Sequence, residues 1–377
     1  MKLTWLLLAI FCYVMLMATG CGPGETPVQN NDFAVLAQSA EDYTPARPGQ
    51  ALTFPRDHGA HPGFRIEWWY LTANLESPDG KTFGAQWTLF RLAVQPPQAR
   101  EPGNALQSKQ VYMGHFAITT PENHVAFQRY SRGGERDRLA RSGVEAAPFV
   151  AWLDDWVMRS TGAALLPMEV FARQDDYSIR FNLDGNSPLV LHGDAGFSQK
   201  HPNGGGSYYY SQPFLAVNGE LEVAGKHIPV TGQAWLDREW SSQFLQGSQT
   251  GWDWFSLHLE NGEKLMLFQL RQDNTTGDAR AYRHGVLIAP GGGTVRLDPD
   301  QIRLEVLRET VVAGRLLPLH WRIELPQIGR TLEIEPLHPE QWMDVDFPYW
   351  EGAVKAVGPS AGERGQGYLE LTGYGQP

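Results

Sequence analysis

The sequence has little cysteine, no basic cluster and no catalytic signature of the common kinds, and each absence excludes a class of protein. Only two of the 377 residues are Cys, both within the first 21 positions, so a disulfide framework or a cysteine zinc site beyond them is excluded. The net charge of −11, without any Lys/Arg-rich run, argues against nucleic acid as the main partner. No Walker loop, dinucleotide fingerprint, Gly-x-Ser-x-Gly elbow or helical zinc motif occurs. What is abundant is aromatic residues (13 Trp, 13 Tyr and 17 Phe), which favour a β protein outside the cytoplasm.

The one long apolar stretch lies at the amino terminus and has the pattern of a targeting signal. After Lys2, residues 3–17 are almost continuously apolar, a run shorter than a typical membrane-spanning helix. Small residues then precede Cys21, as in the lipobox of bacterial lipoproteins, although Ala18 stands where Leu is more usual. We therefore expect residues 1–20 to be a lipoprotein signal peptide; the alternative is an ordinary secretory signal.

Lipidation of Cys21 would anchor the mature chain to a membrane. A single unmodified thiol is unfavourable in an oxidising compartment, which supports a modified Cys21. Gly22 replaces the Asp that retains lipoproteins in the inner membrane, so we expect an outer-membrane anchor that faces the periplasm. Residues 21–50 are rich in Gly, Pro, Gln, Asn and Ala and predict a flexible tether.

From Phe54 onward the pattern is that of successive β-strands. Alternating apolar and polar residues occur over Thr82–Leu92 and Lys264–Leu270, among other segments, and Gly- or Asp-containing turn sequences separate them. Helical periodicity is rare, with short helices expected only at 136–147 and 299–307. The pattern predicts an all-β chain of antiparallel barrels or sandwiches and argues against a parallel doubly wound sheet.

One internal repeat divides the folded body. Residues 67–75 (Glu-Trp-Trp-Tyr-Leu-Thr-Ala-Asn-Leu) align without gaps with residues 251–259 (Gly-Trp-Asp-Trp-Phe-Ser-Leu-His-Leu), and both continue into a turn and a second apolar strand. A separation of 184 residues indicates two copies of one β unit, unless the likeness is a coincidence between aromatic strands. We place the boundary in the Gly-rich segment before the three consecutive Tyr, giving barrels at 51–206 and 207–377.

The second copy carries an acid where the first carries an aromatic residue. Asp253 shares a strand face with Phe255, Leu257 and Leu259, and its counterpart in the first copy is Trp69. An apolar pocket disfavours the carboxylate and raises its pKa, so Asp253 is a candidate proton donor. The alternative is an Asp that pairs with Arg238 or caps a turn.

A second acidic cluster, Asp237-Arg238-Glu239, lies between Trp235 and Trp240. Two carboxylates beside aromatic rings are candidates for acid/base catalysis, although a salt-bridged strand end is the commoner meaning of such a run. Two His beside an acid at 57–61 invite comparison with a metal site, but no third ligand can be identified. We expect no bound metal.

At these motifs the sequence resembles the AttH-like and carotenoid 1,2-hydratase (hydroxyneurosporene synthase) family. The matching blocks, in order, are Phe54–Gly59 with Glu67–Tyr70, Trp235–Trp240, Gly251–Trp254, Tyr349–Gly352 and Gly367–Tyr374. Over about residues 50–377 the resemblance implies two tandem lipocalin-like antiparallel β-barrels with few short helices. It also implies that Asp253 corresponds to the Asp that donates the proton in the hydratase members. Arg238 departs from the His that those members typically have in the Asp-His-Glu-Trp block.

Two functions from different classes follow. In the first, the protein is a lipid-anchored lipocalin-like module of the bacterial envelope that binds a hydrophobic, isoprenoid or lipid-like molecule and works with an ABC transporter permease. Its ligand would contact aromatic side chains of the repeated strands and motif blocks, namely Trp68, Trp69, Trp252, Trp254, Tyr209 and Trp350.

In the second, it is a cofactor-free hydratase or cyclase that protonates an isolated C=C bond. That chemistry requires a protonated acid, a dry cavity and aromatic faces for the carbocation, and no metal or cofactor. The candidate catalytic residues are Asp253, Glu239, Asp237 and Trp240.

Overall fold

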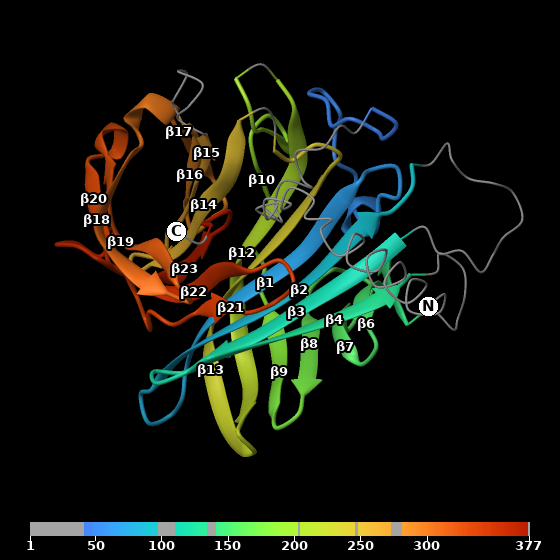
Figure 1. The fold of residues 1–377 in the computed structure, drawn as a ribbon, viewed down its shortest axis with the longest axis horizontal. Coiled ribbons are helices and arrows are strands. Elements are labelled where there is room, and N and C mark those ends of the chain that lie inside the picture. The colour runs from blue at the N-terminus through green and yellow to red at the C-terminus, as the bar shows by residue number, and fades with distance from the viewer. Residues whose placement is uncertain are drawn as a thin grey trace, which may run out of the picture. The chain divides into compact units, whose positions relative to one another are not determined.

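Two antiparallel β-sheets make up the computed structural model, which describes residues 41–96, 110–133, 141–202, 204–245, 248–272 and 281–375. All of them lie in one compact unit, Asp32–Pro377. Each sheet curls around its own apolar core, and Figure 1 shows the second sheet as the orange and red ribbon. We call the sheets with their cores the first and second barrels.

The strand bounds follow chain order. The first sheet contains β1 (Ile66–Glu76), β2 (Thr82–Ala93), β3 (Gln110–Thr119), β4 (His124–Arg132), β5 (Ser142–Ala146), β6 (Phe149–Leu153), β7 (Trp156–Ser160), β8 (Met168–Gln174), β9 (Tyr177–Asp184), β10 (Val190–Leu191), β11 (Phe197–Gln199), β12 (Gly206–Val223) and β13 (Lys226–Ser241). The second contains β14 (Gln249–Leu259), β15 (Lys264–Gln272), β16 (Tyr282–Ile288), β17 (Thr294–Leu297), β18 (Arg303–Val312), β19 (Arg315–Leu325), β20 (Arg330–Pro336), β21 (Trp342–Met343), β22 (Tyr349–Val357) and β23 (Gly365–Leu371). Among the described residues the helical elements are the 3-10 turns η2 (Arg56–His58), η5 (Pro299–Gln301) and η6 (Pro326–Ile328).

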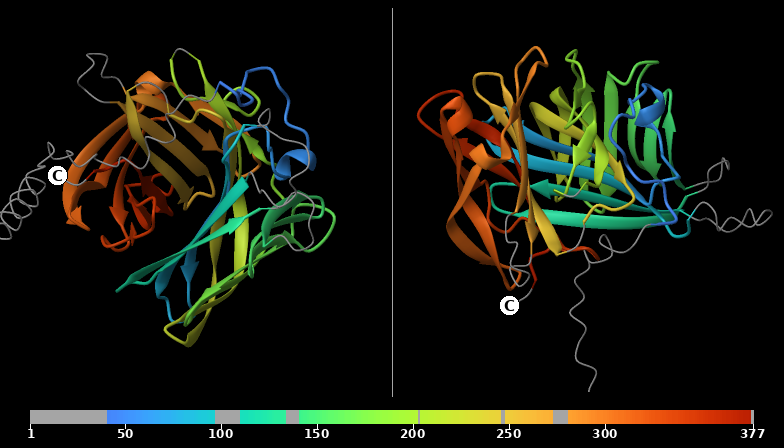
Figure 2. Two further views of the ribbon diagram at one scale, coloured as in Figure 1. Left: turned by 45° about the vertical axis from the view of Figure 1, so that its right-hand side comes forward. Right: turned by 90° about the horizontal axis from the view of Figure 1, so that it is seen from above.

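The strand order confirms the internal duplication. The first sheet runs β4-β3-β2-β1-β13-β12-β9-β8-β7 before two further strands, and the second runs β17-β16-β15-β14-β23-β22-β20-β19-β18. β1 and β14 therefore hold equivalent places: each starts its sheet in sequence, pairs with the next strand through a hairpin, and pairs on its other side with the last long strand of its barrel. Two views in Figure 2 show the two curled sheets side by side.

One expected boundary and two expected helices differ from what is observed. β12 and β13 pair with β9 and β1, so the boundary expected at residues 206/207 does not separate the two sheets, and the chain passes from one to the other between β13 and β14. The described part of the helix expected at 136–147 is not helical, because residues 142–146 form β5. Of the helix expected at 299–307, residues 299–301 form the 3-10 turn η5 and residues 303–307 belong to β18.

Alternation along β1 and β14 creates two kinds of core. Trp69, Leu71, Ala73 and Leu75 point into the first barrel, and Phe255, Leu257 and Leu259 point into the second. The opposite faces of these strands meet between the barrels, where Tyr70 and Trp254 join a third apolar cluster.

Polar contacts also join the barrels across this seam. The Asn74 side-chain amide donates to the Gly367 carbonyl at 2.9 Å, and the Tyr368 hydroxyl donates to the Ala85 carbonyl at 3.0 Å. Because both bonds are buried, they fix how the two barrels are aligned.

Candidate functional site between the two barrels

A cavity of about 110 Å³ lies between the two sheets. Strands β1, β2, β3, β12 and β13 contribute from the first barrel, and β14, β15, β22 and β23 from the second. Half of the 20 described residues that line it are aromatic: Trp68, Tyr70, Phe90, Tyr209, Phe244, Trp252, Trp254, Phe268, Phe347 and Tyr349. Such a site suits an apolar small molecule.

Three carboxyl groups also line this cavity, and they come from both barrels. Asp237 and Glu239 are two residues apart on β13, so strand alternation points both into the cavity and turns Arg238 to the other face. Glu370 faces the cavity from β23 of the second barrel. The cluster therefore depends on both copies of the repeat.

Asp237 is buried and held by three hydrogen bonds. Its Oδ2 accepts from the Tyr209 hydroxyl at 2.6 Å, and its Oδ1 accepts from Trp235 Nε1 at 2.6 Å and from the Ser211 hydroxyl. Burial raises the pKa of Asp237 to about 7, because the effect of burial and of the nearby Glu239 outweighs the opposing hydrogen bonds. A substantial fraction of this group is therefore protonated at neutral pH.

Glu370 and its cross-strand neighbour Glu351 form a second acidic pair. Burial raises the pKa of Glu370 to about 7 against the hydrogen bond from Trp252 Nε1, and Asp237 and Glu239 add to the increase. Glu351 stands directly opposite on β22, and burial together with Glu370 raises its pKa well above the ordinary range. Two facing carboxyls in an apolar seam favour a shared proton over two negative charges.

Within the described part of the lining, Lys200 is the one cation. Its ammonium lies 2.8 Å from Glu239 Oε1, and both side chains are buried. The same nitrogen lies 4.1 Å from the centre of the Phe268 ring and 5.1 Å from that of Tyr209. The cavity thus already holds one ammonium group between a carboxylate and aromatic faces.

Comparison with known proteins agrees with this architecture. The AttH-like family model matches residues 45–374, almost the whole described chain. The chain belongs to the AttH-like family. A crystal structure described as a candidate AttH from Nitrosomonas europaea is 36% identical, covers 88% of this chain and 99% of its own, and superposes with a TM-score of 0.75.

More distant structures share the fold of this AttH-like protein. Kievitone hydratase from Nectria haematococca is 14% identical, with 88% of this chain and 98% of that chain covered and a TM-score of 0.64. CghA is 11% identical, with 90% and 98% covered and a TM-score of 0.54. The search of curated proteins returned no match.

Several residues predicted to contact a ligand do lie at this AttH-like cavity, and others do not. Trp68, Trp252, Trp254 and Tyr209 line it, as do the predicted catalytic candidates Asp237 and Glu239. Trp69 and Trp350 instead belong to the apolar cores of the first and second barrels. Their positions on the interior faces of β1 and β22 explain this difference.

Asp253 lies elsewhere, in an ion pair at the end of the second barrel. Its Oδ1 contacts Arg271 Nη1 and accepts from the Tyr374 hydroxyl at 2.9 Å, while Gln269 Nε2 donates to Oδ2 at 2.7 Å. Asp253 is fully buried but does not line the cavity, so the expected Trp-lined environment of a neutral acid is wrong for this residue.

The duplication explains why Asp253 is there. In the first copy, Glu67 stands directly across from Arg91 and pairs with it; in the second copy, Gly251 stands across from Arg271. A Cβ at position 251 would lie 2.7 Å from Arg271 Nη2, so the glycine leaves room for that guanidinium. Asp253, two residues along the same strand face, supplies the missing carboxylate.

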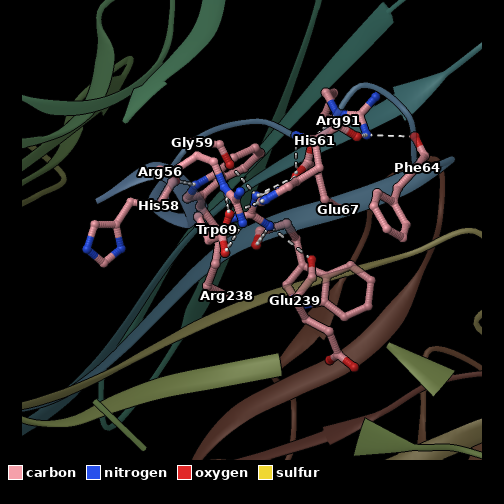
Figure 3. A network of polar contacts seen from close by, with 12 residues as sticks. Arg56, His58, Gly59, His61, Phe64, Glu67, Trp69, Arg91, Arg238 and Glu239 are labelled. Atoms are coloured by element: carbon pink, nitrogen blue, oxygen red, sulfur yellow. Dashed lines mark hydrogen bonds and ion pairs between the residues drawn. The ribbon is translucent and has the colours of Figure 1, made fainter. Parts of the chain in front are cut away.

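Arg238 belongs to the ion-pair network around Glu67 in the first barrel, and its guanidinium points away from the carboxyls of Asp237 and Glu239. Its guanidinium contacts Glu67, donates to the Gly59 carbonyl at 2.6 Å and lies 3.9 Å from the Trp69 ring centre (Figure 3). Burial alone would raise the pKa of Glu67, but Arg91, Arg238 and His61 hold it well below the usual range. The Asp237-Arg238-Glu239 run is thus divided between two faces.

Trp240, His61 and the turn η2 also belong to this network. The His61 ring stacks on Trp240 with centroids 4.1 Å apart, and its nitrogens contact Glu67 and Asp57 at 3.1 and 3.3 Å. Trp240 therefore lies on the face opposite the cavity. Within the described ranges, no group of three or more His, Cys, Asp or Glu side chains is arranged to hold a metal ion.

Glu370, Glu351 and Lys200 were not among the residues predicted for the site. Glu351 and Glu370 do fall inside the Tyr349–Gly352 and Gly367–Tyr374 blocks that carry the family resemblance, which was the available signal. Cys21 and the predicted signal peptide lie outside the described residues. The part of the chain that is described contains no helix with the length and hydrophobicity of a membrane span.

Proposed function

We propose that the protein binds an apolar, unsaturated small molecule in the cavity between the barrels and transfers a proton to one of its C=C bonds. The observation that carries this proposal is the convergence of Asp237 and Glu370, both with a pKa near 7, on a cavity lined largely by aromatic rings. An acid of that pKa is partly protonated at neutral pH and stands beside rings that favour positive charge.

Asp237 is the proposed proton donor. Its proton bonds to the less substituted alkene carbon, the π bond breaks, and the cation forms at the more substituted carbon. Water or a nucleophile within the ligand then bonds to that cation, and the proton it loses returns to Asp237, directly or through Glu370. The acid is regenerated, so the net reaction is hydration or cyclisation without a cofactor.

Hydrogen bonding keeps Asp237 oriented for this step. Tyr209 holds Oδ2 and itself accepts a hydrogen bond from Trp254 Nε1 at 3.2 Å. Ser211 holds Oδ1 and contacts His192 Nε2 at 2.6 Å. Because these partners come from packed strands, the carboxyl can change protonation without changing position.

The test uses deuterated water and a panel of isoprenoid alkenes. We expect deuterium to appear in recovered ligand or product with the wild-type protein, and to fall at least about 10²-fold with Asp237→Asn while ligand still quenches tryptophan fluorescence. Asp253→Asn is the matched control, because it removes a buried carboxyl outside the cavity. Equal deuterium uptake by the wild type and Asp237→Asn would overturn the assignment.

A binding module without catalysis is the second candidate, favoured by the apolar, aromatic lining itself. Ligand binding with no deuterium uptake across the panel would support it over the enzyme. A lipid anchor at Cys21 in the outer membrane and hand-over of the ligand to an ABC permease belong to this candidate, and both rest on the sequence alone.

A further inference from the structure

The charged groups of the cavity are unbalanced toward negative charge. Among the described residues that line it, Asp237, Glu239 and Glu370 are acidic and Lys200 is the only Lys or Arg. Burial lowers the pKa of His115, the remaining basic side chain in the lining, to about 4, so it is neutral at physiological pH. Lys200 and Glu239 neutralise each other at 2.8 Å, which leaves Asp237 and Glu370 without a cationic partner in the lining.

The polar groups next to Glu370 are acids and phenols. Glu351 and Tyr70 are buried, and among the described residues the groups that interact with the Glu351 carboxyl are the hydroxyls of Tyr70 and Tyr349 and the carboxyl of Glu370. Tyr70 lines the cavity and its ring packs edge-on against Trp254 with centroids 5.4 Å apart. Burying carboxyls without a cation is costly, so this end of the cavity is suited to a positively charged bound group.

Lys200 shows what kind of group fits. Its ammonium lies against the rings of Phe268, Tyr209 and Phe244, at 4.1, 5.1 and 5.2 Å from their centres, and against Glu239. The Glu370 end likewise places a carboxyl beside the indole rings of Trp252 and Trp254, but no described residue of the lining places an ammonium there.

We infer that the cavity binds an organic ammonium ion carrying an apolar chain, with the charged head beside Glu370 and Asp237 and the chain along the aromatic walls. This inference rests on the cavity of the proposed function and deepens it, because a stable ammonium has the charge of the carbocation that alkene protonation creates. An anionic amphiphile of the same length meets three carboxyls and binds poorly.

Binding is coupled to proton release. The groups that face Glu370 are Tyr70 on β1, Glu351 and Tyr349 on β22, Asp237 and Glu239 on β13, and Trp252 on β14. A cation beside these groups stabilises the ionised forms, so a carboxyl gives its proton to solvent as the ammonium enters. A quaternary ammonium has no proton of its own, and its affinity therefore rises with pH through neutrality.

The probes are octyltrimethylammonium, 1-octanol and octanoate, titrated calorimetrically into the full chain below their micellar concentrations. We expect octyltrimethylammonium to bind at least about tenfold more tightly than octanol, with octanoate weakest. Glu370→Gln should weaken the binding of octyltrimethylammonium about tenfold and leave the affinity for octanol unchanged. Asp253→Asn should change neither affinity. Heats in phosphate and Tris buffers should differ below neutrality, as proton release requires.

Octanol binding by Glu370→Gln shows that this variant is folded and its cavity intact. Ammonium affinity no better than that of octanol, or unaffected by Glu370→Gln, would overturn the inference. Ammonium binding without deuterium uptake from any alkene would refute the proton-transfer function and leave the inference standing. Deuterium uptake that octyltrimethylammonium does not inhibit would refute the inference about the ammonium and leave the proton-transfer function standing.

Discussion

Replacing Asp237 by Asn removes a carboxyl whose proton the fold retains, and the effect on stability depends on pH. Burial raises the pKa of Asp237 from 3.8 to about 7 in the folded state. Between these values the folded protein keeps a proton that the unfolded chain has released, so the contribution of Asp237 to stability is largest at low pH and decreases as pH rises toward 7. The Asn variant has no such proton.

The size of the effect follows from the same pKa. Within this window the stability difference between the wild type and Asp237→Asn changes by about 1.4 kcal/mol per pH unit. From about pH 5 to about pH 8 the wild type should therefore lose about 2–3 kcal/mol relative to the variant, since the slope ends near pH 7. Buried histidines, such as His192 and His284, change the stability of both proteins and cancel in the difference.

Urea unfolding followed by tryptophan fluorescence at a series of pH values measures this difference. Met113→Leu is the matched control, because Met113 lines the cavity without an ionisable group, so its difference from the wild type should be constant with pH. A constant difference for Asp237→Asn as well would mean that Asp237 has no raised pKa. That result would remove the protonated acid on which the proposed chemistry depends.

Two further predictions concern residues outside the cavity. Asp253→Asn breaks a buried ion pair with Arg271 and should lower the free energy of unfolding by about 2–3 kcal/mol, measured by urea titration. The affinity for octanol should stay the same. A loss of octanol binding in the folded variant would show that Asp253 contributes to the binding site. Cys21→Ser should release the protein from the membrane fraction; sedimentation with outer membranes in high salt would show that Cys21 is not the anchor.

Strand alternation accounts for most of what could be predicted from the sequence. The aligned faces of residues 67–75 and 251–259 predicted equivalent strands, and the structure places both in the same position of duplicated sheets. Alternation also put Asp237 and Glu239 on one face. It did not say which face looks into a cavity, because each face of a strand here is buried: one in a barrel, the other at the seam.

The partners of these acids could not be predicted in the same way. Glu370 lies 133 positions after Asp237 in sequence, and their approach depends on how the second barrel packs against the first. Arg271 lies near the end of the second strand of the repeat, but its pairing with Asp253 depends on hairpin register and on the space that Gly251 leaves. Tertiary packing therefore decided which acid is neutralised and which stays unpaired.

The duplication itself gives a reason for the cavity to lie between the barrels. Each barrel interior is filled by apolar side chains, and the charged residues at its end are matched by arginine, Glu67 with Arg91 and Asp253 with Arg271. The outward faces of β1 and β14 are not constrained by a barrel core, so the two copies could diverge there. Carboxyls placed at such a seam lose water without gaining an arginine, which is the condition that raises their pKa. The pairing that makes Asp253 a structural residue and the lack of pairing that makes Asp237 a candidate acid are thus two outcomes of one strand pattern.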